Sequence, residues 1–352
     1  MANDESSLRV LILGANGFIG HHLSRRILAT TNWEIDAMDL ASDRLSELRA
    51  HPRFRFFQGD MTVEHDWVGH RIEECDVVLP LVAIATPATY VTDPLRVFEL
   101  DFEANLTVIR AVAAAGKRVV FPSTSEVYGM NGDDEFDPET SHLVYGPIHK
   151  SRWIYACSKQ LLDRVISAYG QQRGLRYTLF RPFNWIGTGL DALESTNEGS
   201  SRVVTKFLSD IHRGGPITLV DGGSQRRSFT GIKDGLDALM AILRNPGGVA
   251  NGKVYNIGNP RNDVSIADLA ARMISIAGEF PEYADCLKGL EVVVRHGTDF
   301  YGSGYQDMSR RVPSIRHIAG DLGWVPQVAL DDALREVIGA YRPSSRVQAE
   351  GL

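Results

Sequence analysis

Cysteine is scarce in this chain of 352 residues: only Cys75, Cys157 and Cys286 are present. Three widely separated cysteines are too few for the disulfide framework that stabilises many small secreted proteins. We therefore expect a fold held together by its apolar core, in a reducing compartment such as the cytosol. The ten histidines, including His21 and His22, show no ligand spacing with acids or cysteines, so we predict no metal site.

A long uninterrupted hydrophobic run is missing as well. The most apolar stretch, residues 77–91, contains two prolines and is short for a membrane-spanning helix. Residues 1–5 are polar and acidic, which does not fit a signal peptide. The formal net charge of −7 disfavours non-specific binding to nucleic acid but is compatible with a basic pocket for an anionic ligand. We expect a cytoplasmic protein that binds neither membranes nor nucleic acid.

What is present is an ordinary globular composition with alternating strand and helix patterns. Hydrophobic residues make up 43% and charged residues 23% of the chain, and its length suits one large domain or two modest ones. A long helix is expected over residues 98–115, between two of the strands. The alternation predicts an α/β fold, a Rossmann-type doubly wound parallel sheet. The strands of this sheet are expected at residues 8–13, 33–40, 53–58, 77–84, 118–121 and 177–180.

The pattern changes after Asn184, where glycine, acidic and small residues become frequent. We interpret the second half as a smaller α/β substrate lobe that interleaves with the large domain. Its helices are expected at residues 203–213, 266–276 and 330–341, and a short strand at 217–220. Residues 254–258 are expected to form a late strand that returns to the large sheet. The predicted large domain comprises residues 8–184 plus about 228–260, the lobe 185–227 plus 261–342, and the loose tails 1–7 and 343–352.

A glycine-rich turn joins the first predicted strand to a helical pattern. Glycine at these positions permits a tight turn and the close approach of a pyrophosphate to the helix N-terminus. The spacing is Gly-x-x-Gly-x-x-Gly instead of the usual Gly-x-Gly-x-x-Gly, and a glycine triplet alone is also typical of an ordinary turn. Its place between strand and helix favours a dinucleotide site. The expected cofactor contacts in this turn are Gly14, Asn16, Gly17, Phe18, Ile19 and Gly20.

Acidic residues at the ends of the next strands bear on the identity of the cofactor. Asp39 lies 25 residues after Gly14, where an acid can bind both ribose hydroxyls of adenosine and repel a 2′-phosphate. This favours NAD over NADP, although a surface acid at a strand end is the simpler alternative. Asp60 closes the third strand, where we expect the adenine. Ala83 follows in the fourth strand and is assigned to the same cofactor.

Tyr155 and Lys159 lie one helical turn apart if residues 153–159 form a helix. A free tyrosine has a pKa of about 10, and a nearby ammonium lowers that pKa by favouring the phenolate. Such a tyrosine can take a proton from an alcohol while a cofactor takes the hydride. The four-residue spacing alone is also compatible with a packed tyrosine beside a solvated lysine.

Taken together, the glycine turn, Asp39, the Ser-Thr-Ser-Glu run at residues 123–126 and the Tyr155/Lys159 pair resemble the extended short-chain dehydrogenases/reductases, or NAD-dependent epimerase/dehydratase family. These enzymes act on nucleotide sugars. The chain is most similar to the UDP-glucuronate decarboxylase domains of bifunctional polymyxin-resistance proteins, and next to the UDP-apiose/UDP-xylose synthases. The stretches that carry this narrower resemblance are residues 80–87, 121–129, 152–155, 181–185 and 304–307.

The resemblance implies a catalytic set. Tyr155 with Lys159 would take the C4 hydroxyl proton of the sugar, and Thr124 and Ser125 would hydrogen-bond the C4 oxygen. The resulting 4-keto sugar carries a C5 carboxylate and, as a β-keto acid, can lose carbon dioxide. Glu126 is expected to act near C5 or to position the carboxylate.

Arg311 matches the arginine assigned as proton donor in the decarboxylases. A guanidinium can clamp a carboxylate with two hydrogen bonds. Its pKa is too high for a literal acid, so a role through water or through charge alone is equally open. Arg310 is expected on the surface.

The resemblance also implies substrate contacts and shows two departures. Thr218 stands where close relatives have a lysine at the nucleotide, so one ligand charge goes unpaired or is met otherwise. Residues 187–189, Gly-Thr-Gly, replace a Gly-Pro-Arg turn. Both departures put details of nucleotide affinity in doubt and leave the redox residues untouched. The implied substrate-binding residues are Ala85, Tyr90, Thr124, Ser125, Arg152, Asn184, Arg202, Thr218, Arg227 and Tyr305.

The implied activity is the NAD-dependent oxidative decarboxylation of UDP-glucuronate to UDP-4-keto-pentose, UDP-xylose or both. Two alternatives remain open. One is a 4-epimerase or dehydratase reaction on a neutral nucleotide sugar, and the other is a non-catalytic NAD-binding regulator. The resemblance further implies a homodimer formed through the helix at residues 98–115 and the helix that carries Tyr155.

Overall fold

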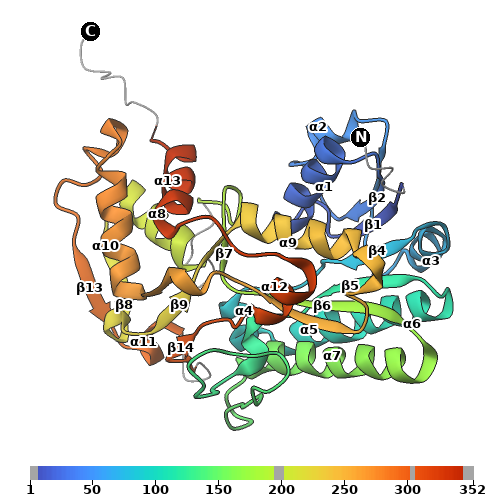
Figure 1. Cartoon of the computed structure of the whole chain (residues 1–352). Helices are drawn as coiled ribbons and strands as arrows, with labels where there is room; N and C mark the ends of the chain where they lie inside the picture. The colour runs from blue at the N-terminus through green and yellow to red at the C-terminus, as the bar shows by residue number, and fades with distance from the viewer. Residues whose placement is uncertain (1–6, 194–201, 302–305, 344–352) are drawn as a thin grey trace.

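Seven parallel strands form the centre of the molecule (Figure 1). This computed structural model describes residues 7–193, 202–301 and 306–343. The strand order is β11-β6-β5-β4-β1-β2-β3, and every neighbouring pair runs parallel. The predicted Rossmann-type α/β fold is confirmed. The strands are β1 (Arg9–Leu13), β2 (Glu34–Asp39), β3 (Phe54–Gln58), β4 (Val77–Pro80), β5 (Arg118–Pro122), β6 (Arg176–Pro182) and β11 (Lys253–Ile257).

Helices cover both faces of this sheet (Figure 1). On one face α1 (Phe18–Thr30) packs against α9 (Ile232–Arg244), and on the other lie α3 (His65–Glu74), α6 (Asn105–Ala114) and α7 (Trp153–Arg173). Side chains of a strand alternate between faces, so Val10 and Ile12 of β1 join one apolar core and Leu11 and Leu13 join the other. A strand that is buried on both faces is continuously apolar, which explains why its sequence pattern is so clear.

The second region of the chain forms smaller sheets and a helical layer. Within the described residues the sheets are β10-β7, β12-β9-β14 and β13-β8. Figure 1 shows α8, α10 and α13 together on the left, beside these strands. The elements are β7 (Trp185–Ile186), β8 (Ile217–Val220), β9 (Arg226–Ser228), β10 (Thr230–Gly231), β12 (Asp263–Ser265), β13 (Val292–Arg295), β14 (Arg310–Arg311), α8 (Val203–Arg213), α10 (Ile266–Ala277) and α13 (Leu330–Ala340).

Short helical segments connect the larger elements. They are α2 (Ser46–Arg49), α4 (Pro87–Thr92), α5 (Pro94–Phe98), α11 (Gly297–Tyr301), α12 (Arg316–Leu322), the π-helical η1 (Glu99–Ala104) and the 3-10 turns η2 (Ser125–Tyr128), η3 (Asp221–Gly223), η4 (Pro246–Gly248), η5 (Pro260–Asn262) and η6 (Pro281–Tyr283).

Two predicted elements differ from the structure. The expected helix at residues 98–115 is the continuous series α5, η1 and α6, which begins earlier because Pro94 opens it and the Asp93 side chain caps it. The fourth strand ends at Pro80 and does not continue to Ile84. Residues 81–86 form a partly buried apolar loop, and a buried loop resembles a strand in sequence.

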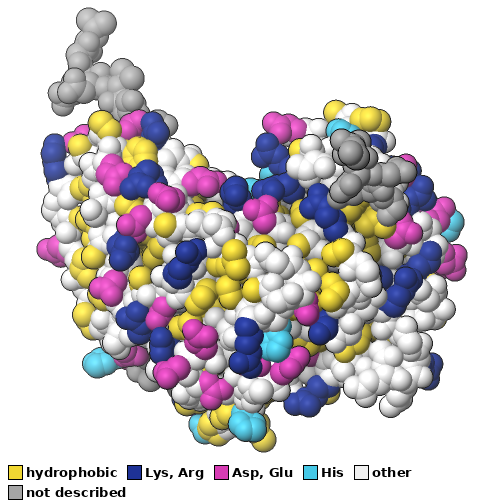
Figure 2. Space-filling view, in the orientation of Figure 1, with side chains coloured by type: hydrophobic (Ala, Val, Ile, Leu, Met, Phe, Trp, Pro, Cys, Tyr) yellow, Lys and Arg dark blue, Asp and Glu magenta, His cyan; other side chains and the backbone are white. Residues whose placement is uncertain are grey.

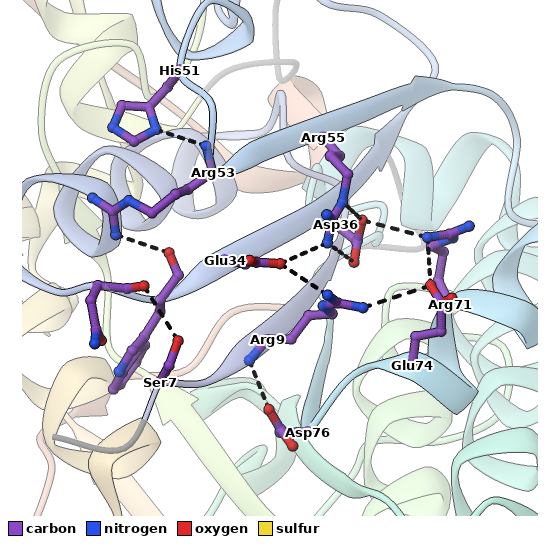
Figure 3. A network of polar contacts seen from close by, with 12 residues as sticks. Ser7, Arg9, Glu34, Asp36, His51, Arg53, Arg55, Arg71, Glu74 and Asp76 are labelled. Carbon is purple, nitrogen blue, oxygen red and sulfur yellow. Dashed lines mark hydrogen bonds and ion pairs between the residues drawn. The ribbon is translucent and has the colours of Figure 1, made fainter.

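A network of ion pairs occupies the amino-terminal edge of the sheet (Figure 3). The Arg55 guanidinium lies between two acids, 2.8 Å from the buried Asp36 and 3.0 Å from Glu34. Arg9 reaches the same Glu34 carboxylate at 3.1 Å. Arg9, Glu34, Asp36 and Arg55 thus each have a charged partner within the protein. A ligand site is expected at the opposite, carboxyl-terminal edge, where open α/β sheets bind ligands.

The described residues bear on several of the predicted absences. Cys75, Cys157 and Cys286 are free. In the part of the chain that the structure describes, no helix is long and apolar enough to cross a membrane. Within the same residues no group of three or more His, Cys, Asp or Glu is placed to hold a metal ion. The homodimer through α6 and α7, and the cytoplasmic location, stay predictions.

The close packing of α1 on the glycine turn gives a prediction about stability. A Cβ atom at Gly20 would lie 2.2 Å from the Gly14 carbonyl oxygen, because α1 packs directly on the preceding turn. We expect Gly20→Ala to lower the free energy of unfolding by about 1–3 kcal/mol, as overpacking does. Urea denaturation measures it. The control is Gly69→Ala in α3, where a Cβ meets no atom within 4 Å and stability should rise by about 0.5–1 kcal/mol. A stable Gly20→Ala protein would contradict the close approach.

Candidate active site

A cavity of about 650 Å³ lies at the carboxyl-terminal edge of the sheet. Its wall combines the glycine turn after β1, the loops after β4 and β5, the start of α7, and residues of α8, β8 and β9. The cavity therefore lies between the parallel sheet and the second region. The predicted site residues that line it are Gly14, Gly17, Phe18, Ile19, Gly20, Ala83, Ala85, Tyr90, Thr124, Ser125, Glu126, Arg152, Tyr155, Lys159, Asn184, Arg202, Thr218, Arg227 and Arg311.

Three predicted site residues that the structure describes are not in this wall. Asn16 lies in the turn after β1, Asp39 is the last residue of β2, and Asp60 lies in the turn after β3. Tyr305 lies outside the described residues. Asp60 accepts hydrogen bonds from the hydroxyl and the backbone of Thr62, and these bonds lower the pKa of its carboxyl. Its expected contact with adenine stays a prediction.

The glycine turn has the shape that a dinucleotide requires. Gly14 has φ +92°, a left-handed conformation that favours glycine, and Gly20 allows α1 to begin against the turn. The Asp39 carboxylate accepts a hydrogen bond from Asn16 N at 2.9 Å, which holds this acid beside the turn. The position at the end of β2 suits a contact with a ribose. The residues present thus fit NAD.

Tyr155 is buried within the cavity wall and stacks on Tyr90. The two rings are nearly parallel, with centroids 4.7 Å apart and an angle of 7°. Burial raises the pKa of Tyr155, and the charges of Asp101 and Glu126 raise it further, while a hydrogen bond with Thr124 lowers it. Without a ligand, Tyr155 is therefore a neutral phenol at neutral pH.

Lys159 forms an ion pair with an acid that the sequence analysis missed. Its Nζ lies 3.2 Å from Asp101 Oδ1, and both side chains are buried. The other Asp101 oxygen accepts a hydrogen bond from Ile84 N at 3.0 Å, so the acid is fixed to the loop after β4. This differs from the expected arrangement, in which Lys159 acts mainly on Tyr155. The signal in the sequence was an acid within the apolar helix pattern of residues 98–115.

Glu126 lies between two arginines at the other side of the tyrosine. Its carboxylate is 3.4 Å from Arg152 Nη2 and 3.6 Å from Arg311 Nη1. Arg311 Nη1 also donates a hydrogen bond to Ser125 Oγ at 3.2 Å. Burial and the neighbouring cations Arg227 and Arg152 lower the pKa of Arg311 to about 10, so it stays charged at neutral pH. Two guanidinium groups against one carboxylate leave a positive charge for an anionic ligand.

Strand pairing brings the arginines together. β9 and β14 run in parallel and place Arg227 opposite Arg311. Arg227 donates to Met308 O at 2.8 Å and lies 2.5 Å from Asp307 Oδ1. Burial opposes ionisation of Asp307, but Arg227 and Arg152 lower the pKa of its carboxyl. This pairing, between segments more than 80 residues apart, was not predicted.

The described wall of the cavity is strongly cationic. Six basic side chains border it and only two acidic ones, Glu126 and Asp307. On the outer face drawn in Figure 2, by contrast, basic and acidic side chains are intermingled. Positive charge is thus concentrated inside the cavity, as a small anionic ligand requires. The six bases are Arg152, Lys159, Arg202, Lys206, Arg227 and Arg311, of which Lys206 was not predicted.

Comparison with known proteins agrees with this geometry. The sequence matches the NAD dependent epimerase/dehydratase family over residues 10–258. The chain belongs to this family. It is similar to the crystal structure of the PbgP3 protein from Burkholderia pseudomallei, with 58% identity, a TM-score of 0.87, and coverage of 96% of this chain and 97% of that one. NAD is therefore the cofactor of this epimerase/dehydratase.

More distant members of known structure share the fold. A UDP-glucuronic acid 4-epimerase from Bacillus cereus has 20% identity and a TM-score of 0.77, covering 94% of this chain and 98% of its own. DesIV, a dTDP-glucose 4,6-dehydratase from Streptomyces venezuelae, has 23% identity and a TM-score of 0.79, covering 95% and 97%. These epimerase/dehydratase relatives support the architecture.

The Asp101–Lys159 pair gives a prediction on pH dependence. Because the Asp101 charge helps to raise the pKa of Tyr155, Asp101→Asn should lower that pKa and increase the fraction of phenolate at a given pH. The acidic limb of the pH profile of kcat/KM for NAD reduction should move to lower pH. Glu103→Gln, in the same π-helical segment but exposed, is the control. A loss of activity without movement of the limb would mean that Asp101 is only structural.

Proposed function

We propose that this epimerase/dehydratase is a UDP-glucuronate decarboxylase that forms UDP-4-keto-pentose, UDP-xylose or both. The observation that carries the proposal is the position of the Arg311–Glu126–Ser125 cluster in the same cavity as Tyr155 and Lys159. One end of the cavity suits the oxidation of a sugar hydroxyl. The adjoining part, with Arg311, suits a carboxylate on the same sugar.

The charges of the cavity support a nucleotide sugar with an added carboxylate. A diphosphate and a carboxylate are both anionic, and arginine pairs well with either through its two parallel N–H groups. Arg311, buried and cationic, is the proposed partner of the sugar carboxylate. Arg227 and Arg202 border the part of the cavity formed by β9 and α8 and are the proposed partners of the diphosphate. We propose that the parallel sheet binds NAD and the second region binds the nucleotide.

The first chemical step is the oxidation of the C4 hydroxyl. The Tyr155 oxygen takes the hydroxyl proton. Thr124, which hydrogen-bonds to Tyr155, keeps the Tyr155 oxygen aligned with the C4 oxygen of the sugar. NAD, when bound, supplies the acceptor for the C4 hydride and brings a positive charge that favours the phenolate. Lys159, with donors that Asp101 does not use, is placed to hold the ribose of the cofactor.

The second step is the loss of carbon dioxide. A ketone at C4 is β to the C6 carboxylate, so the C5–C6 bond breaks and its electron pair moves into a C4–C5 enolate. The Tyr155 hydroxyl, now protonated, and the Thr124 and Ser125 hydroxyls can donate hydrogen bonds to the enolate oxygen. C5 then takes a proton from water held near Glu126. Arg311 stays protonated and acts through its charge, because its pKa remains well above neutral pH.

The residue before Glu126 argues against loss of water. Ser125 has no carboxyl group, so it cannot protonate a leaving hydroxyl as an acid would. A 4-epimerase that acts on a neutral nucleotide sugar does not need the arginine cluster, since that sugar carries no carboxylate. These reactions are therefore alternative outcomes of the test.

Incubation of the purified protein with UDP-glucuronate and NAD+ tests the proposal. NADH is followed by absorbance and the nucleotide sugar by mass. Loss of carbon dioxide with stoichiometric NADH means release of UDP-4-keto-pentose, and loss with little net NADH means an internal redox cycle that ends in UDP-xylose. UDP-glucose, which lacks the carboxylate, is the control and should keep its mass. An unchanged mass with UDP-glucuronate would contradict the proposal.

A further inference from the structure

A lysine that no part of the proposed mechanism uses borders the cavity. Lys206 lies on α8, four residues after Arg202, so both face the same side of the helix. α8 packs against β8, whose Thr218 borders the same corner of the cavity. The corner is otherwise formed by the apolar side chains of Val203, Phe207 and Val220. Lys206 and Arg202 are thus the two charged groups in a part of the wall that is otherwise uncharged.

An acid behind the wall holds this lysine in place. The Lys206 ammonium forms an ion pair with Asp210, one turn further along α8, and only 7% of the Asp210 side chain is exposed. Burial raises the pKa of Asp210, and Lys206 opposes that shift. An ammonium has three N–H donors. Within the described residues the Asp210 contact is its only hydrogen bond, so two donors remain for a ligand.

In three neighbouring ion pairs, the basic side chain borders the cavity and the acidic side chain does not. Lys206, Arg202 and Lys159 border the cavity, whereas their partners Asp210, Asp191 and Asp101 do not. Each pair therefore presents its positive end to a ligand.

The N-terminus of α8 adds to the positive potential at this corner of the cavity. Val203 and Val204, the first two residues of this 11-residue helix, are in the wall, and the side chain of its N-cap residue Arg202 does not cap the helix. A helix N-terminus favours a negative charge. An anion at this corner thus meets a helix terminus together with a lysine and an arginine.

We propose that Lys206 binds the diphosphate of the nucleotide sugar and supplies the charge that Thr218 does not. Asp210 is the positioning residue that orients the lysine. The inference rests on the proposed function only in that the ligand is a nucleoside diphosphate. It identifies α8 as a phosphate-binding element. It also resolves the open alternative at Thr218, because the diphosphate charge that β8 leaves unpaired is paired by Lys206 of α8.

The test measures binding of UDP and of uridine, without turnover. Lys206→Gln should weaken UDP binding about tenfold by calorimetry and leave uridine binding unchanged, because only UDP carries the diphosphate. Lys233→Gln is the matched control, since Lys233 forms the same four-residue pair with Asp237 on α9, outside this cavity. An unchanged dissociation constant for UDP in Lys206→Gln would overturn the proposal.

Two double variants separate phosphate binding from a structural role. In the double variant Lys206→Gln with Asp210→Asn, the buried acid is removed together with its cation. Restored UDP affinity in that protein would show that Lys206 only neutralises Asp210 and would overturn the proposal, whereas persistent weak binding supports it. In Lys206→Gln with Thr218→Lys, the charge returns to the same corner from β8, and recovered UDP affinity supports the proposal.

The outcome is independent of the reaction catalysed. If Lys206→Gln weakens UDP binding but the unaltered protein does not decarboxylate UDP-glucuronate, the decarboxylase proposal fails and the phosphate contact stands. If decarboxylation occurs and Lys206→Gln leaves the dissociation constant of UDP unchanged, only the proposed phosphate contact is wrong.

Discussion

The Tyr155→Phe protein is expected to reduce NAD with UDP-glucuronate at a rate about 10²–10⁴-fold below that of the unaltered protein, the usual contribution of a general base. The substitution removes only the hydroxyl that takes the C4 proton. The ring stays, and with it the stack on Tyr90 and the packing in the wall. The dissociation constants of NAD and UDP should therefore change little. Single-turnover absorbance of NADH measures the rate, and calorimetry measures the binding.

The neighbouring tyrosine is the matched control. Tyr90 is as deeply buried as Tyr155, and burial also raises its pKa well above the ordinary value. Tyr90→Phe removes a hydroxyl of the same kind from the same stacked pair. If Tyr90→Phe slowed NADH formation as much as Tyr155→Phe, the loss could not be assigned to the base. Full activity in Tyr155→Phe would refute the role of Tyr155 altogether.

Arg311→Met is expected to lower kcat/KM for UDP-glucuronate by roughly 30-fold to several thousand-fold, because truncating one member of a buried charge network costs about 2–5 kcal/mol. Methionine retains much of the apolar stem and loses the cation. The carboxylate of the substrate would then face Glu126 with one cation fewer. Initial rates of carbon dioxide release at several substrate concentrations measure the effect, and UDP binding should remain.

The adjacent arginine provides the control for this variant. Arg310 points away from the cavity, with 42% of its side chain exposed and ion pairs to Asp134 and Asp263. The pair with Asp134 is exposed and contributes at most about 1 kcal/mol, and Asp263 keeps its ion pair with Arg226, so Arg310→Met should change kcat/KM little. Equal losses in the two variants would mean that β14 is needed for folding and that Arg311 has no separate role at the carboxylate. Partial rescue by Arg311→Lys would identify charge as the main contribution.

Segments with short-range signals were predictable from the sequence. The turn from β1 to α1 was visible because a fully buried parallel strand is continuously apolar and its turn requires glycine. The predicted bounds of α8 and β8 agree with the structure, since each has a clear pattern and a breaking residue next to it: Gly214 follows α8 and Pro216 precedes β8. The doubly wound sheet followed from the alternation of such segments.

Other elements had no such signal. The strands β7, β9, β10, β12 and β14 are two or three residues long, too short for a period of two to show. β4 was predicted too long, because the loop that follows is also apolar. These elements are defined by partners distant in the chain, and pairing with a distant partner leaves no trace in a single local pattern.

The identities of the candidate catalytic residues were visible in the sequence, but their electrostatic states were not. Tyr155 and Lys159 were found by their spacing, yet burial of the tyrosine and the pairing of Lys159 with Asp101 depend on α7 packing against η1. Arg311 and Arg227 meet only because β14 pairs with β9. Lys206 was not predicted, because a basic residue on an amphipathic helix is usually solvated. Sequence by itself determined the fold class and the residues able to carry the chemistry, since these depend on local pattern and side-chain type. Tertiary structure decided charge and position, because the pKa and the orientation of a buried group depend on which distant groups pack around it.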